Sequence, residues 1–168
     1  MIATTERPRG TIAPWSPLQA TLVGGLLAGA ADMSYALLWF SGVKGIPWMK
    51  IPQSVAGGLI GKATFDGGAG TVALGLALHW LIALIWAAIF VSVARKFLPA
   101  IIRTPIPSGL AYGVFVYFFM NWVVLPLDAM HTTPRLAPWN TTLTGLFVHM
   151  AGIGLAIAIS ASKTDSGG

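Results

Sequence analysis

Residues 70–93, GTVALGLALHWLIALIWAAIFVSV, form an apolar run that contains no Asp, Glu, Lys or Arg. A helix rises about 1.5 Å per residue, so a run of this length can cross a hydrocarbon core of about 30 Å. We therefore predict a transmembrane helix over these residues.

Three similar runs lie on either side of it, over about 18–40, 106–127 and 141–161. The chain has 168 residues, of which 55% are hydrophobic and 9% charged, and its mean hydropathy is +0.76. Soluble domains carry about 25% charged residues. The sequence therefore predicts an all-α integral membrane protein with four transmembrane helices. It excludes soluble enzymes, disulfide scaffolds, coiled coils and disordered tails.

The four runs make up one transmembrane domain over residues 18–161, with tails over 1–17 and 162–168. The first tail has several prolines and no hydrophobic periodicity, and we predict that it is flexible. It does not resemble a cleaved signal peptide, because the apolar run after it is too long and no small-residue cleavage site ends it.

A further weakly apolar segment lies between the first two spans, at residues 51–68, IPQSVAGGLIGKATFDGG. It is too short to cross a membrane, so we predict a short interfacial or re-entrant helix. Gly57 and Gly61 lie one turn apart there and would allow close approach to another helix.

The net charge of +5 does not indicate nucleic-acid binding, because the basic residues are scattered over the tails and loops. In a membrane protein such residues mark topology and contact anionic headgroups. With a cytoplasmic N-terminus, the inner segments would hold Arg7, Arg9, Arg95, Lys96, Arg103 and Lys163, and the outer ones Lys44, Lys50, Lys62 and Arg135. This difference favours cytoplasmic N- and C-termini. The absence of Cys excludes disulfides and thiolate metal sites.

The second and fourth spans resemble each other. Residues 71–90 aligned with 141–160 match at Thr71 and Thr141, Gly75 and Gly145, Leu76 and Leu146, His79 and His149, Ala88 and Ala158, and Ile89 and Ile159. The other two spans carry the helix-packing pairs Gly25 with Gly29 and Gly109 with Gly113. We predict a duplicated two-helix unit whose copies are parallel, with His79 and His149 at similar depth.

Each of these histidines shares a helical face with the glycine four residues before it. The pairs are Gly75 with His79 and Gly145 with His149. Such a pair can serve close helix packing, in which the imidazole is hydrogen-bonded across the interface. Its other use is to seat a flat macrocycle, haem b or a chlorin, on the glycine with the imidazole on its metal. The sequence leaves both uses open, with proton handling as a third.

Asp32 is the one acidic residue within a predicted span, where an ionised carboxylate is unfavourable. Counted from the helix ends, Asp32, His79, Asn121 and His149 fall in the same half of the membrane. Their convergence predicts a buried polar cluster, either a hydrogen-bonded contact between helices or a proton-relay or ligand pocket. Asp128 and His131 belong to the next loop, where we predict a solvated turn.

Four short motifs are similar to those of the YagU-like family of small bacterial inner-membrane proteins. They are GGLLAGAAD at residues 24–32, GLALHW at 75–80, TTPRLAPW at 132–139 and GLFVH at 145–149. The resemblance implies a bacterial inner membrane, four spans, and His79 and His149 as family-typical positions. It implies no catalytic residues.

Three functions follow from the sequence. The first is a non-enzymatic accessory or packing subunit, in contact with lipids and with other membrane subunits or further copies of itself, but not with nucleic acid. The second is a haem- or chlorin-binding protein that uses His79 and His149. The third is a proton-linked transporter or channel that uses Asp32 and the two histidines. No catalytic triad, phosphate loop, paired carboxylates or metal-ligand set is present, so we predict that the protein is not an enzyme.

Overall fold

The computed structural model describes residues 13–134, 136 and 138–165, and the described part is helical without strands. Four helical segments are long and apolar enough to cross a membrane: Pro17–Val43, Gly68–Phe97, Pro105–Leu127 and Trp139–Ser162. This confirms the predicted fold class, a four-helix integral membrane protein. Of the tails predicted over 1–17 and 162–168, residues 1–12 and 166–168 lie outside the described residues.

Three of the four spans combine α-helical and π-helical segments. The first span is α1 (Pro17–Ala36) and η1 (Leu37–Val43), and the second is α3 (Gly68–Phe97). The third is α5 (Pro105–Phe119), η3 (Met120–Val124) and α6 (Leu125–Leu127). The fourth is α7 (Trp139–Val148), η4 (His149–Gly154) and α8 (Leu155–Ser162).

Short helices connect the spans. The predicted helix between the first two spans is α2 (Lys50–Ile60), which continues into the 3₁₀ segment η2 (Gly61–Asp66). Gly61 was expected to pack against another helix, but it ends α2 with a φ of +69°, a backbone conformation that suits glycine. The short helix α4 (Pro99–Arg103) joins the second span to the third.

The first helix begins where its sequence provides a capping box. The Ser16 hydroxyl accepts a hydrogen bond from the Gln19 backbone N–H at 3.1 Å, and the Gln19 side chain accepts one from the Ser16 N–H at 2.8 Å. Pro17 occupies the first turn, where no N–H is required. These contacts fix the start of α1 one residue before the predicted position.

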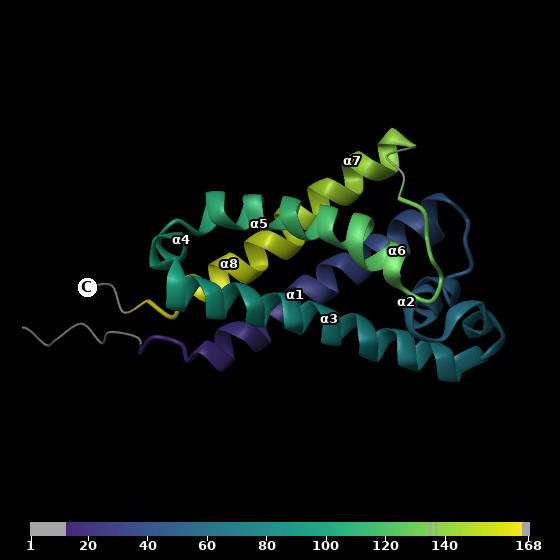
Figure 1. Cartoon of the computed structure of the whole chain (residues 1–168), viewed down its shortest axis with the longest axis horizontal. Helices are drawn as coiled ribbons and strands as arrows, with labels where there is room; N and C mark the ends of the chain where they lie inside the picture. The colour runs from purple at the N-terminus through teal and green to yellow at the C-terminus, as the bar shows by residue number, and fades with distance from the viewer. Residues whose placement is uncertain (1–12, 135, 137, 166–168) are drawn as a thin grey trace, which may run out of the picture.

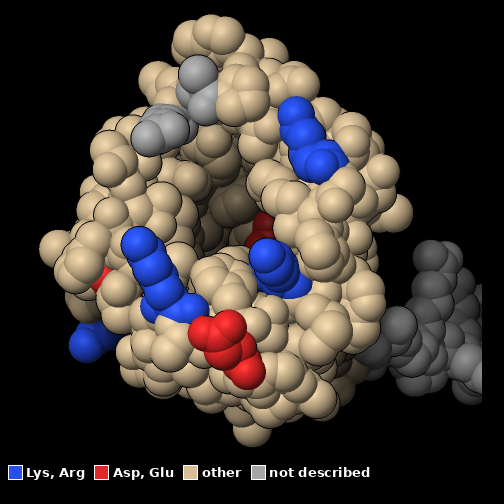
Figure 2. Space-filling model, turned by 90° about the vertical axis from the view of Figure 1, so that its right-hand side faces the viewer, with Lys and Arg blue, Asp and Glu red and all other residues tan. Residues whose placement is uncertain are grey.

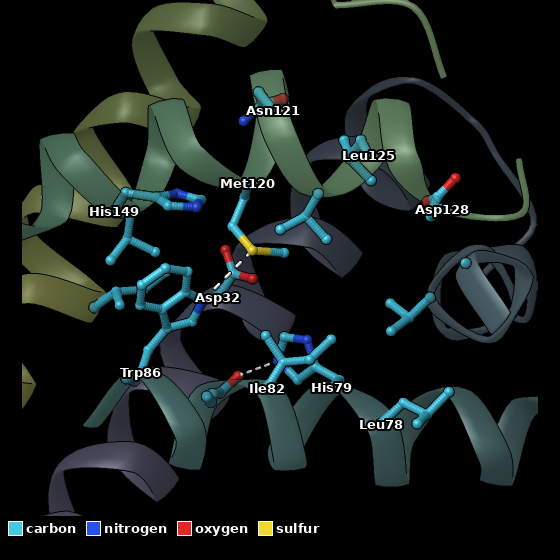
Figure 3. A pocket seen from close by; sticks show the side chains of 18 of the residues that line it. Asp32, Leu78, His79, Ile82, Trp86, Met120, Asn121, Leu125, Asp128 and His149 are labelled. Carbon is cyan, nitrogen blue, oxygen red and sulfur yellow. Dashed lines mark hydrogen bonds between the residues drawn. The ribbon is translucent and has the colours of Figure 1, made fainter. Parts of the chain in front are cut away.

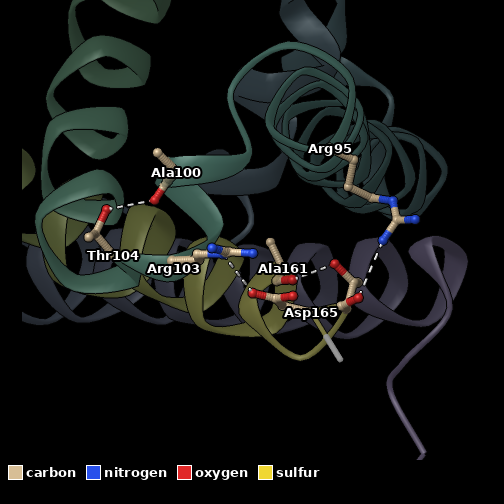
Figure 4. Close-up of polar contacts among 7 residues, drawn as sticks. Arg95, Ala100, Arg103, Thr104, Ala161 and Asp165 are labelled. Atoms are coloured by element: carbon tan, nitrogen blue, oxygen red, sulfur yellow. Dashed lines mark hydrogen bonds and ion pairs between the residues drawn. The ribbon is translucent and has the colours of Figure 1, made fainter. Parts of the chain in front are cut away.

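Both ends of the described chain lie at the same end of the bundle, which we call the terminal end (Figure 1). The Trp15 backbone N–H donates to the Lys163 carbonyl oxygen at 2.8 Å. Figure 4 shows α4 held there by an ion pair of 3.3 Å between the Arg103 guanidinium and the Asp165 carboxylate. The opposite end, which we call the loop end, is formed by α2, η2 and the loop after α6 (Figure 1).

Glycines allow the spans to cross with their backbones in contact. A Cβ at Gly25 would lie 2.9 Å from the Leu84 Cα, and one at Gly29 would lie 3.3 Å from the Ala83 Cβ, so α1 packs closely on α3. Gly109 and Gly113 have the same relation to the fourth span, described further below. The glycines predicted to pack helices therefore lie at contacts within this chain.

The second and third spans meet through large aromatic side chains. The ring centroid of Trp86 on α3 lies 6.2 Å from that of Tyr112 and 5.3 Å from that of Phe119 on α5. The Tyr112 hydroxyl also donates to the Trp86 carbonyl oxygen at 2.7 Å. The first and fourth spans instead pack directly, through α1 with α8 and η4. In a duplicated two-helix unit, the contact between the second and third spans would correspond to the contact between the fourth and first. These two contacts differ, so the duplication stays a prediction.

Replacing Tyr112 with Phe removes the hydroxyl that joins α5 to α3. We expect the free energy of unfolding to fall by about 0.6 kcal/mol, the average for one such hydrogen bond in a membrane protein. Unfolding in SDS, followed by circular dichroism, measures this loss. Tyr117→Phe is the matched control, because no described residue hydrogen-bonds the Tyr117 hydroxyl. An equal loss in both variants would contradict a role for the Tyr112 hydroxyl.

Candidate functional site

A cavity of about 410 Å³ opens between the spans toward the loop end. Its walls come from α1, α2, α3 and α5, from η3, α6 and the loop after it, and from η4. Viewed from the loop end in Figure 2, the molecule is hollowed, with Lys and Arg side chains around the opening and an acidic side chain deep within it. Most of the lining is apolar, and the polar side chains are few.

Two of the π-helical segments supply the wall opposite α3. Met120, Asn121 and Val124 come from η3, while His149 and Ile153 come from η4. A π-helical turn contains an extra residue, which changes the direction of the side chains that follow it, and such turns are frequent at functional sites. No feature of the residue pattern predicted these π-helical segments.

The structure brings Asp32, His79, Asn121 and His149 to this one cavity, although they come from four different spans (Figure 3). Their placement does not create a hydrogen-bonded cluster. Among the described residues no two of these side chains bond to each other.

Each histidine instead uses one ring nitrogen to bond a backbone carbonyl. His79 Nε2 lies 2.9 Å from the Gly29 carbonyl oxygen on α1. His149 Nδ1 lies 2.9 Å from the carbonyl oxygen of Gly145, one turn earlier in its own helix. A carbonyl oxygen only accepts, so these nitrogens carry the protons. In the neutral rings, His79 Nδ1 and His149 Nε2 are left as acceptors.

Asn121 and Asp32 complete the polar part of the wall. The Asn121 amide Nδ2 donates to the Tyr117 carbonyl oxygen at 2.9 Å, which leaves its side-chain oxygen as an acceptor. Asp32 is partly exposed to the cavity, and no described residue hydrogen-bonds or ion-pairs with its carboxylate. Asp32 and His79 also border a neighbouring cavity of about 350 Å³ beneath α2.

The cavity is closed toward the terminal end by a floor of buried side chains. Trp86, Val116 and Ile153 line its lower part and are 9%, 1% and 7% exposed. The Trp86 indole N–H points to the Met120 sulfur at 3.4 Å, as Figure 3 shows. Within the described bundle this floor separates the cavity from the terminal end.

Asp128 lies at the mouth of the cavity, where the sequence predicted only a solvated turn. One of its carboxylate oxygens accepts from the backbone N–H groups of Met130 at 2.8 Å and His131 at 3.0 Å. The Ala129 N–H donates to the Gly58 carbonyl oxygen at 3.0 Å, which ties this loop to α2. The sequence did contain a feature that could have predicted this position. Asp128 directly follows the third span, which ends on the side of the membrane nearer to Asp32.

The space beside Gly75 and Gly145, where a macrocycle could have bound, is occupied by other parts of the protein. A Cβ at Gly75 would overlap the Pro52 carbonyl oxygen of α2. A Cβ at Gly145 would lie 3.2 Å from the Tyr117 ring and 3.6 Å from the Tyr35 hydroxyl. The described residues also contain no group of three or more His, Cys, Asp or Glu side chains that could hold a metal ion.

No protein-family model, no curated protein and no solved structure matches this chain. The resemblance to the YagU-like family therefore stays a prediction, and the chemistry of the cavity itself has to indicate its use.

Proposed function

We propose that the protein is a non-catalytic integral membrane protein that binds a small, largely apolar molecule in the cavity between its spans. The observation that carries the proposal is the cavity itself, about 410 Å³ with apolar walls and a few convergent polar groups. Binding sites for small molecules have volumes of about 300 to 1,000 Å³ and this kind of lining.

Two features favour binding over the other functions predicted from the sequence. Gly25, Gly29, Gly109 and Gly113 are engaged within the chain, so they give little support to an accessory subunit that packs on partners. The closed floor favours a site reached from one end over an open channel.

We further propose a bacterial inner membrane, with both termini cytoplasmic and the cavity open to the outer side. The basic residues support this orientation. The described basic residues of the terminal end are Arg95, Lys96, Arg103 and Lys163, and those of the loop end are Lys44, Lys50 and Lys62.

Filling the cavity tests the proposed function. Ile82 lines the cavity, whereas its neighbour Leu81 is 52% exposed on the outer face of α3. Ile82→Trp places an indole in the cavity, and Leu81→Trp places the same side chain outside it. We expect native mass spectrometry of gently purified protein to show a bound small molecule in the wild type and in Leu81→Trp, with occupancy reduced about tenfold in Ile82→Trp.

Equal occupancy in the two variants would place the bound molecule outside the cavity. A wild-type protein without any bound species, purified from its own membrane, would contradict the proposal.

A further inference from the structure

We infer that the ligand of this cavity is an organic cation, a protonated amine with an apolar body, whose ammonium group binds Asp32. The inference rests on the proposed function and names the chemical class of the ligand. Three observations carry it: the state of the Asp32 carboxylate, the hydrogen-bonding character of the other polar groups, and the distribution of charge around the cavity.

The Asp32 carboxylate lies within a membrane span without a partner among the described residues. Water reaches it only through this cavity and the neighbouring one beneath α2, so its charge is less well solvated than at the surface and is unfavourable while unpaired. A cation that enters the cavity would supply the missing partner. The gain is larger there than at the surface, because the surroundings have a lower dielectric constant.

The remaining polar groups of the wall also present acceptors. His79, Asn121 and His149 each use an N–H to donate to a backbone carbonyl, as described above. What they leave for a ligand are three acceptors, His79 Nδ1, His149 Nε2 and the Asn121 side-chain oxygen, and one donor, the second N–H of the Asn121 amide. An ammonium group has three donors and no acceptor, so it matches a wall of this kind. A carboxylate ligand, which only accepts, does not.

The charges around the cavity point the same way. The whole chain has a net charge of +5, yet the charged residues of the cavity lining are Asp32 and Asp128. Lys50 lines the neighbouring cavity, with its ammonium 6.0 Å from the centre of the Phe65 ring. Lysines at the loop end are near solvent, where salt screens them; the deep carboxylate is screened much less.

The apolar part of the wall would hold the body of the ligand. Ile82, Trp86 and Leu125 line the cavity around the polar groups (Figure 3). Burial of an alkyl chain against these side chains adds a hydrophobic contribution, and the indole face of Trp86 can attract a nearby cation. An inorganic cation would leave these walls unused.

The test compares three probes of similar size but different charge: hexylammonium, hexanol and hexanoate. Each is titrated by calorimetry into purified protein in lipid nanodiscs, and the Ile82→Trp variant provides the blank for partition into lipid. We expect hexylammonium to bind about tenfold more tightly than hexanol, and hexanoate to bind most weakly. Asp32→Asn should remove the preference for the amine. Asp66→Asn changes a carboxylate of the loop end that does not line the cavity, and it should leave the preference intact.

The outcomes separate this inference from the proposed function. If hexanol binds as tightly as hexylammonium, or hexanoate binds best, the cation assignment is wrong while the binding cavity stands. If no probe binds to the wild type more than to Ile82→Trp, both ideas fail. The wild-type comparison decides the question even if Asp32→Asn does not fold.

Discussion

Replacing Gly113 with Leu is expected to abolish stable folding of the bundle. A Cβ at Gly113 would overlap the His149 carbonyl oxygen and lie 2.5 Å from the Met150 Cα. These are backbone atoms of η4, so no change of side-chain rotamer can relieve the overlap. The contact is reciprocal, because a Cβ at Gly154 would overlap the Gly109 carbonyl oxygen. The third and fourth spans therefore cross with their backbones touching.

We expect Gly113→Leu to lower the free energy of unfolding by about 3 kcal/mol or more, since overpacking against backbone is at the upper end of such effects. The midpoint of unfolding in SDS and the monodisperse fraction after extraction measure the loss. Gly70→Leu is the matched control, because a Cβ at Gly70 meets nothing within 4 Å. Gly113→Ala should fall between the two, and similar stability in all three variants would refute the close crossing.

The spans could be predicted because hydropathy and helical rise are properties of each segment alone. The runs over 18–40, 70–93, 106–127 and 141–161 needed no knowledge of their neighbours. The meeting of Asp32 and His149 in one cavity follows from similar reasoning, since depth in the membrane can be counted from each helix end. In a small bundle, polar residues at the same depth avoid the lipid by facing the interior, and they therefore lie near one another.

The details of the cavity could not be predicted, because they depend on how segments pack. Gly75 faces α2, and nothing in the spacing between Gly75 and His79 distinguishes a helix from a macrocycle as the neighbour of that glycine. The π-helical turn that begins at His149 has no sequence signature of its own. The floor under the cavity depends on Trp86 of α3 meeting the aromatic side chains of α5.

The second large effect concerns access to the cavity, and the absence of Cys from the chain makes it measurable with single introduced thiols. Asn121 lines the cavity and also a smaller one of about 320 Å³ beside Thr132 and Pro134, while Phe118 on the same span is 43% exposed on its outer surface. Asn121→Cys should react with a charged, membrane-impermeant thiol reagent about a hundredfold faster than Phe118→Cys, because only a thiol in contact with water forms the reactive thiolate.

The side from which Asn121→Cys is labelled carries a second conclusion. The cavity opens at the loop end and is closed by its floor toward the terminal end, so the reagent should reach position 121 from one side of the membrane only. With the proposed cytoplasmic termini, that side is the outer one, and intact spheroplasts should be labelled while inverted vesicles are not. The reverse result would overturn the proposed orientation and leave the cavity in place. Equal rates for Asn121→Cys and Phe118→Cys from both sides would mean that water does not enter between these spans. That result would contradict the proposed binding site.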